Sequence, residues 1–214
     1  MTAGGRRRRR WWLWGAIALL VVIVLVVIGV IALPILTHRD GGLSHQQLEG
    51  EAWAVSATAQ GDDGRTRTIT LRGESGAEVD PASLAVGDRV VVEGTGFDAG
   101  QGIYVAVCVI PASPTEKPGP CVGGAPQQAQ DAEAHEGEVQ WAPSNWINDD
   151  WAWRLFGSRP YDDAASGAFT AYLELADPGD IDCSADRCAI VTRNDHTAAA
   201  DRVQDVVLPI RLVD

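Results

Sequence analysis

The sequence predicts an all-β fold, an antiparallel sandwich, that follows one N-terminal transmembrane helix. Two observations carry this prediction. A run of residues without any charge, 11–36, comes directly after five arginines. Beyond residue 50, short stretches that alternate apolar and polar residues are separated by turn-forming glycines and aspartates. This pattern is typical of antiparallel β-strands.

The uncharged run is long enough to cross a bilayer. As an α-helix its 26 residues reach roughly 39 Å, more than the about 30 Å of a hydrocarbon core. The arginines at 6–10 favour a cytoplasmic N-terminus, and Trp11, Trp12 and Trp14 lie where an aromatic belt is expected. A cleaved signal peptide would have a shorter apolar run and a small-residue cleavage site. We therefore expect an uncleaved, single-pass signal anchor with a cytoplasmic tail at 1–10.

Four cysteines lie after the apolar run, at positions 108, 121, 183 and 188. An even number of cysteines in an extracytoplasmic domain indicates two disulfides. The alternative is a zinc site, but zinc frameworks usually contain C-x-x-C pairs, which these spacings lack. We expect two disulfides, and neither a metal nor a cofactor.

The part of the chain after residue 36 is strongly acidic. It holds 29 acidic and 12 basic side chains, a net formal charge of −17. Such a surface repels phosphate backbones, so direct nucleic-acid binding is disfavoured. The basic residues are nearly all arginine, with Lys117 as the one lysine, which suggests a GC-rich coding sequence.

The strand-like runs give the expected order of segments. Residues 37–50 are polar without a clear period and predict a juxtamembrane linker. Residues 51–83 predict an N-terminal β-hairpin region, with strands at 52–59 and 65–73 on either side of a Gly/Asp turn. The sandwich itself is expected over 84–214. Its strand-like runs are 88–97 and 102–110, which flank "DAGQ" like a second hairpin, then 167–176, 188–195 and 204–213.

Two stretches of this C-terminal part carry a resemblance to a known family. "GDRVVVEGTGFDAGQGIYVAVC" (87–108) and "DCSADRCAIVTRND" (182–195), followed by a final "VVLPIRL" strand, resemble the neocarzinostatin-type apoproteins of actinobacteria. The resemblance implies a seven-stranded, immunoglobulin-like sandwich with disulfides Cys108–Cys121 and Cys183–Cys188. It also implies a cleft for an apolar small molecule, which in the best-known members is an enediyne chromophore.

The chain departs from this family in two ways. Family members are secreted and soluble, so this chain would be a membrane-anchored relative. It also has a longer loop between Cys108 and Cys121 and a large insertion at 122–160. Because fold transfers better than function, no pocket residue of the family is assigned here.

The insertion contains an unusual density of aromatic residues. Trp151 and Trp153 alternate with Ala152, so we expect both on one face of a strand, in the core. For Trp141 and Trp146, in "WAPSNW", we expect partial exposure. Two other interpretations stay open: the aromatic residues line a small-molecule pocket, or they stack on sugars or a protein partner. The candidate ligand-binding residues are Trp141, Trp146, Trp151, Trp153, Phe156 and Tyr104.

Other motifs for chemistry are weak. Asp177, Asp180, Asp182 and Asp186 could suggest calcium, but they lack the EF-hand spacing and are expected to form a solvated acidic turn. The sequence contains no nucleophile elbow and no histidine pair at metal-binding spacing. We therefore expect a protein that is not an enzyme. It would be a cell-surface binding or structural module, held in the lipid bilayer by residues 11–36, with a cell-envelope component as partner. The alternative is a carrier for an apolar small molecule.

Overall fold

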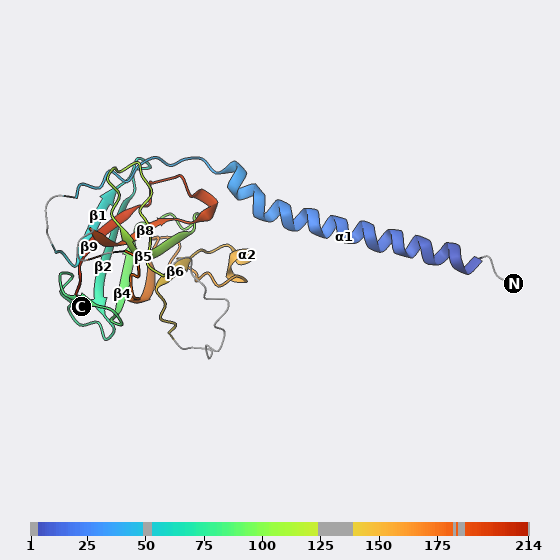
Figure 1. The fold of residues 1–214 in the computed structure, drawn as a ribbon. Coiled ribbons are helices and arrows are strands. Elements are labelled where there is room, and N and C mark those ends of the chain that lie inside the picture. The colour runs from blue at the N-terminus through green and yellow to red at the C-terminus, as the bar shows by residue number, and fades with distance from the viewer. Residues whose placement is uncertain (1–3, 49–52, 124–138, 182, 184–186, 214) are drawn as a thin grey trace. The chain divides into compact units, whose positions relative to one another are not determined.

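The computed structural model describes residues 4–48, 53–123, 139–181, 183 and 187–213 (Figure 1). The chain forms two compact units, Met1–His38 and Arg39–Asp214. We call the second the C-terminal unit. The division falls within the segment that was predicted as a polar linker.

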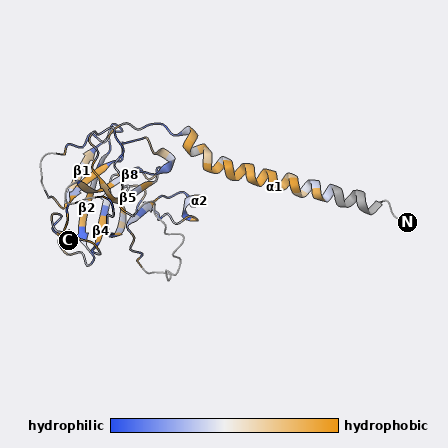
Figure 2. Ribbon diagram, in the orientation of Figure 1, coloured by the Kyte–Doolittle hydropathy of each residue, from blue (hydrophilic) through white to orange (hydrophobic). Residues whose placement is uncertain are grey.

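The N-terminal unit is a single helix, α1 (Gly4–Thr37). Its segment Trp11–Leu33 is long and apolar enough to cross a membrane, and Figure 2 shows apolar residues along most of this stretch. The large side chains from Leu19 to Ile28 are all exposed, so the helix has no polar stripe to face water. An N-terminal apolar helix that could anchor the chain is thus confirmed.

The C-terminal unit contains two four-stranded antiparallel sheets. In the first sheet the order is β1-β2-β4-β7, with bounds Ser56–Gln60, Thr66–Gly73, Arg89–Thr95 and Phe169–Glu174. In the second sheet the order is β6-β5-β8-β9, with bounds Ser144–Ile147, Ile103–Val109, Cys188–Asn194 and Val206–Ile210. A short parallel pair, β3 (Leu84–Ala85) with β10 (Leu212–Val213), completes the strands. The resemblance implied seven strands, whereas these two sheets contain eight.

The two sheets share one hydrophobic core, which we call the main core. Alternate residues of each strand point into it, as the period of two requires. In β2, for example, Ile69 and Leu71 are buried and Thr68 and Thr70 are not. Members from both sheets include Val90, Val92, Phe169, Leu173, Val105, Ile147, Ile190 and Leu208.

The second sheet is buried on both faces. Along β8, Cys188 and Ile190 enter the main core, while Ala189 and Val191 belong to a separate group on the other face. We call this group the outer-face cluster. Its members are Ala106, Cys108, Ile110, Ala189, Val191 and Val207, with Leu48 and Cys121 packed against them. Burial on both faces explains why the sequence of β8 is nearly continuously apolar.

Of the two predicted hairpins, one is correct. β1 and β2 pair antiparallel, as predicted. The second prediction is wrong: β4 pairs with β2 and β7, whereas β5 pairs with β6 and β8. The chain crosses from one sheet to the other after Gly96. Only glycine fits there, because φ is +83° and a Cβ would lie 2.0 Å from the carbonyl oxygen of Thr66. Both strands put alternate apolar residues into the shared core, so their pattern does not tell a hairpin from a crossing.

The segment predicted as a linker packs on the second sheet. Leu43 forms a β-bridge with Arg202. The side-chain amide of Gln46 donates to the carbonyl of Val207 and accepts from its N–H, both at 2.7 Å. Because β9 is an edge strand, this amide covers backbone groups that would otherwise remain open. We call residues 41–48 the docked segment.

Both predicted disulfides are present, Cys108–Cys121 and Cys183–Cys188. The first holds the loop 110–120 over the outer-face cluster. The second joins the start of β8 to the chain that precedes it. The described part of the predicted insertion also supplies β6, an integral strand of the second sheet, while residues 124–138 lie outside the described residues.

Candidate functional site

The tryptophan-rich stretch contains a short helix, α2 (Trp151–Arg154), where a strand was predicted. Asp150 caps its N-terminus: the carboxylate accepts a hydrogen bond from the N–H of Ala152 at 2.9 Å. Residues two apart on a helix point to nearly opposite sides. Accordingly Trp153 is 8% exposed, whereas Trp151 is 68% exposed. The predicted burial is confirmed for Trp153 and wrong for Trp151.

The other two tryptophans were predicted to be partly exposed. This is wrong for Trp146, which is 6% exposed because it lies on β6 directly opposite Tyr104 of β5. It is confirmed for Trp141, which is half-buried. The Trp141 ring meets the ring of Tyr172 edge-on at 5.3 Å, and the guanidinium of Arg89 lies 5.5 Å from its centroid.

Three of the predicted ligand residues meet around one histidine. The ring of His196 lies 4.8 Å from Trp153 and 5.3 Å from Trp146, and these two tryptophan rings are 5.7 Å apart. Tyr104 is 5.9 Å from Trp146. We call these four residues the aromatic cluster. Phe156 touches its rim, 6.1 Å from Trp153.

Polar contacts fix the geometry of the cluster. The hydroxyl of Tyr104 and Nδ1 of His196 lie 2.8 Å apart. Burial, together with the negative charge of Asp195, raises the pKa of Tyr104 to about 12, so the phenol stays protonated at neutral pH. The hydroxyl therefore remains available as a donor to the imidazole.

Beneath the cluster lies a fully buried carboxylate, that of Asp195. It accepts five hydrogen bonds, two on Oδ2 from Trp146 Nε1 and Asn148 Nδ2, and three on Oδ1 from Gln101 Nε2, Thr197 N and Thr197 Oγ1. A buried charge is tolerated only when it is satisfied in this way. Gly102 is required beside it, because a Cβ there would lie 2.0 Å from Asp195 Oδ2.

The structure thus brings together Tyr104, Trp146, Trp153 and Phe156, and separates Trp151 and Trp141 from them. Sequence reasoning missed Asp195 and His196. The available signal was the "NDHT" turn after an apolar strand, since an aspartate there commonly caps a helical turn, here the 3-10 helix η1 (His196–Ala198).

The pockets described on the C-terminal unit lie away from the aromatic cluster. One, of about 510 Å³, is lined by residues of β3, β10 and 177–181. Within the described residues, no group of three or more histidine, cysteine, aspartate or glutamate side chains is placed to hold a metal ion. Of the acidic turn considered for calcium, Asp182 and Asp186 lie outside the described residues.

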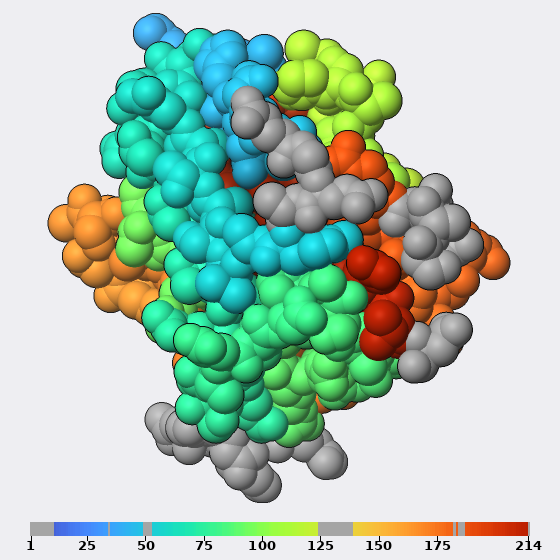
Figure 3. Space-filling view, turned by 90° about the vertical axis from the view of Figure 1, so that its left-hand side faces the viewer, coloured from blue at the N-terminus to red at the C-terminus, as the bar shows by residue number. Residues whose placement is uncertain are grey.

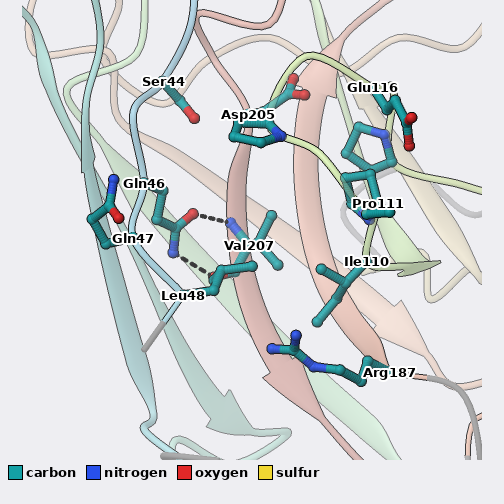
Figure 4. A pocket seen from close by; sticks show the side chains of 13 residues that line it. Ser44, Gln46, Gln47, Leu48, Ile110, Pro111, Glu116, Arg187, Asp205 and Val207 are labelled. Carbon is teal, nitrogen blue, oxygen red and sulfur yellow. Dashed lines mark hydrogen bonds between the residues drawn. The ribbon is translucent and has the colours of Figure 1, made fainter. Parts of the chain in front are cut away.

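A further pocket, of about 260 Å³, lies beside the outer-face cluster. Figure 3 shows the docked segment and the loop 110–120 next to each other on that face. In Figure 4, Asp205 stands at one end of the pocket and Arg187 at the other, with Val207 and Ile110 between them. The remaining lining is Ser44, Gln46, Gln47, Leu48, Pro111, Ala112, Pro114, Glu116 and Pro118.

Asp205 is the buried charge of this pocket, 5% exposed. Its Oδ2 accepts a hydrogen bond from Nη1 of Arg202 at 3.0 Å. Its Oδ1 has no hydrogen-bond partner among the described residues. Burial raises the pKa of Asp205 to about 7, although the positive charges of Arg202 and Arg193 act in the opposite direction. The group can therefore be neutral or ionised near physiological pH.

Comparisons with protein-family models, with curated proteins and with solved structures found no match to this chain. A functional assignment therefore depends on the two sites just described. The rings of the aromatic cluster contact one another, whereas the pocket at Asp205 has a volume of about 260 Å³ and is lined by a carboxylate whose buried Oδ1 has no hydrogen-bond partner among the described residues.

The two tryptophans of α2 provide a matched pair for a test of the fold. Trp153→Ala removes a buried ring and should lower the free energy of unfolding by about 3–5 kcal/mol. Trp151→Ala removes an exposed ring and should change it by less than about 0.5 kcal/mol. Denaturant titrations of both variants check this, and equal losses would contradict the placement of α2.

The pKa of Asp205 predicts a pH dependence of stability. Because this pKa is raised from 3.8 to about 7 in the folded chain, the folded state binds the proton more tightly than the unfolded state. The resulting stabilisation is lost as pH rises from about 4 to about 7. Asp205→Asn stays neutral, so the Tm of the wild type should fall by several degrees relative to that of the variant over this window.

A control comes from Asp163, an exposed carboxylate whose pKa is lowered, first by a hydrogen bond from Ser166. The stability that Asp163 contributes is lost only as the pH falls below the ordinary pKa of an aspartate. Asp163→Asn should therefore leave the change of Tm between pH 5 and 7 as it is in the wild type. If Asp205→Asn also leaves this change of Tm as it is in the wild type, Asp205 titrates normally.

Proposed function

We propose that the chain is a membrane-anchored, extracytoplasmic binding module that holds a small molecule in the pocket at Asp205. The apolar helix α1 supports the anchor. The two disulfides support an oxidising compartment for the C-terminal unit. The arginines at 6–10 support a cytoplasmic N-terminus and a single pass.

We further propose an immunoglobulin-like sandwich for the C-terminal unit, as a relative of the neocarzinostatin-type apoproteins. The support is the pair of antiparallel sheets on one core, together with disulfides at both positions that the resemblance implied. The eighth strand, β6, comes from the insertion that distinguishes this chain.

The observation that carries the binding proposal is that Asp205 lines the pocket, while its buried Oδ1 lacks a hydrogen-bond partner in the described chain. A buried acceptor without a partner is costly, so a ligand that donates a hydrogen bond to it is favoured. The best donor for a carboxylate is a cation. We therefore infer a ligand with a protonated amine at the Asp205 end and an apolar body over Ile110 and Val207.

Arg187 at the other end of the pocket and the pocket volume restrict the class of ligand further. The exposed guanidinium of Arg187 favours an anionic or strongly polar group at that end. At about 260 Å³, the pocket is smaller than the roughly 300–1,000 Å³ typical of drug-sized ligands. The ligand class is thus a small amphoteric molecule, not a large polycyclic chromophore.

Binding without catalysis is the function that this arrangement supports. Nucleophilic catalysis needs a nucleophile held beside an oriented base. The partner that the fold gives to Asp205 is the guanidinium of Arg202, a group that serves as neither nucleophile nor base.

Native mass spectrometry tests the proposal directly on the full chain, purified in mild detergent from its own source. We expect a retained small molecule in the wild type. Asp205→Asn should weaken its binding by about tenfold or more, since a hydrogen bond to a charged group contributes about 1.5–3 kcal/mol. Ala112→Trp, at the exposed rim of the pocket, should block it.

Ala165→Trp supplies the matched control, because Ala165 is also exposed but lies in the turn before β7. This variant should retain the molecule. Retention in all three variants would place the ligand elsewhere, and an empty wild type would argue for a purely structural module.

The proposed topology has its own test. Protease added to intact spheroplasts should digest the C-terminal unit and leave residues 1–10 protected. A mature soluble protein that begins near residue 37 would show cleavage of the apolar segment and contradict the anchor.

A further inference from the structure

The C-terminal unit carries an exposed apolar patch on and just after α2. Trp151, Leu155 and Phe156 are 68%, 73% and 56% exposed. Trp151 and Leu155 are four residues apart, the spacing that places side chains on the same face of a helix. On the opposite side, Trp153 and Ala152 are buried. The patch is therefore held rigidly, with its apolar groups directed away from the fold.

This patch lies at the same end of the second sheet as the first residue of the docked segment. Ile147 at the end of β6 and Asn194 at the end of β8 both pair with Ile103. α2 follows β6, and residues 195–205 follow β8. Within 195–205, His196 contacts Trp153, and Asp201 accepts a hydrogen bond from the N–H of Gly41 at 2.8 Å. The segment 195–205 thus contacts both α2 and the first residue of the docked segment.

The covalent connection to α1 is short. The helix ends at Thr37, and Gly41 is already bound, which leaves residues 38–40 between them. Fully extended, the chain from 37 to 41 spans no more than about 15 Å. If α1 spans the bilayer, this end of the C-terminal unit is confined to the membrane surface, and even a weak affinity for lipid becomes effective.

The chemistry of the patch suits the interfacial region of a bilayer. Tryptophan prefers the level of the lipid headgroups, where its ring meets both apolar and polar surroundings. Leucine and phenylalanine favour the acyl boundary just below. The exposed Arg154 of α2 can rest its stem on this boundary and direct its guanidinium to lipid phosphates.

We propose that Trp151, Leu155 and Phe156 insert into the outer lipid interface and fix the orientation of the C-terminal unit on the membrane. This proposal rests on the proposed membrane span. The occupant of the patch is thus the bilayer surface, not a second protein.

Spin labelling of the full chain in phosphatidylcholine nanodiscs tests the inference. The chain has no free cysteine, so Leu155→Cys provides a single labelling site. Val86→Cys is the matched control, because Val86 is also an exposed apolar residue, 53%, and precedes β4 at the opposite end of the first sheet. Collisions of the spin label with oxygen indicate that it lies in lipid, and collisions with a water-soluble nickel complex indicate that it lies in water.

We expect the ratio of oxygen to nickel accessibility at position 155 to exceed that at position 86 several-fold. Adding Trp151→Ser and Phe156→Ser to the Leu155→Cys chain should remove most of this difference. Equal ratios at the two positions, or a higher ratio at 86, would overturn the proposal, as would an effect that survives the serine substitutions. If α1 does not span the bilayer, the chain should not co-purify with the nanodiscs. This result is distinct from equal accessibility ratios in a chain that does co-purify.

Discussion

The buried carboxylate of Asp195 is the interaction on which the aromatic end of the C-terminal unit depends. It accepts from Gln101 before β5, from Trp146 and Asn148 of the β6 region, and from Thr197 after β8. Three segments that are distant in the sequence thus share one buried negative charge. Because a charge in a low-dielectric interior must be satisfied, these donors hold β6 and the aromatic cluster in one arrangement.

A second polar network ties the two sheets together near the same end. Arg67 of β2 is fully buried; it pairs with Asp63 and donates from Nε to Oε1 of Gln204. Gln204 in turn donates to Oδ1 of Asn194 at 2.9 Å. Polar groups therefore help to fix the geometry of this end of the C-terminal unit.

The sequence predicted much of the fold, because strand alternation, turn residues and cysteine number act locally. It predicted the apolar helix, most strands, the β1–β2 hairpin and, through the resemblance, both disulfides. It did not show that β4 and β5 belong to different sheets, since alternate apolar residues fit either arrangement.

The candidate site was harder to predict from the sequence than the fold. Trp151 and Trp153 alternate as in a strand, but Asp150 begins a helix, and the two side chains point to opposite sides of it. Asp195 and Asp205 gain their properties from burial, which depends on residues distant in the sequence.

The docked segment also determines how the C-terminal unit would bear a mechanical load. A pull transmitted along the chain from α1 first meets the hydrogen bond from Gly41 to Asp201 and the paired bonds between Gln46 and Val207. These contacts act together with the bridge between Leu43 and Arg202, so tension enters the fold at β9 and the turn that precedes it. Leu43 also exchanges two hydrogen bonds with Asp62 in the turn between β1 and β2, so the same pull loads the first sheet at this turn as well.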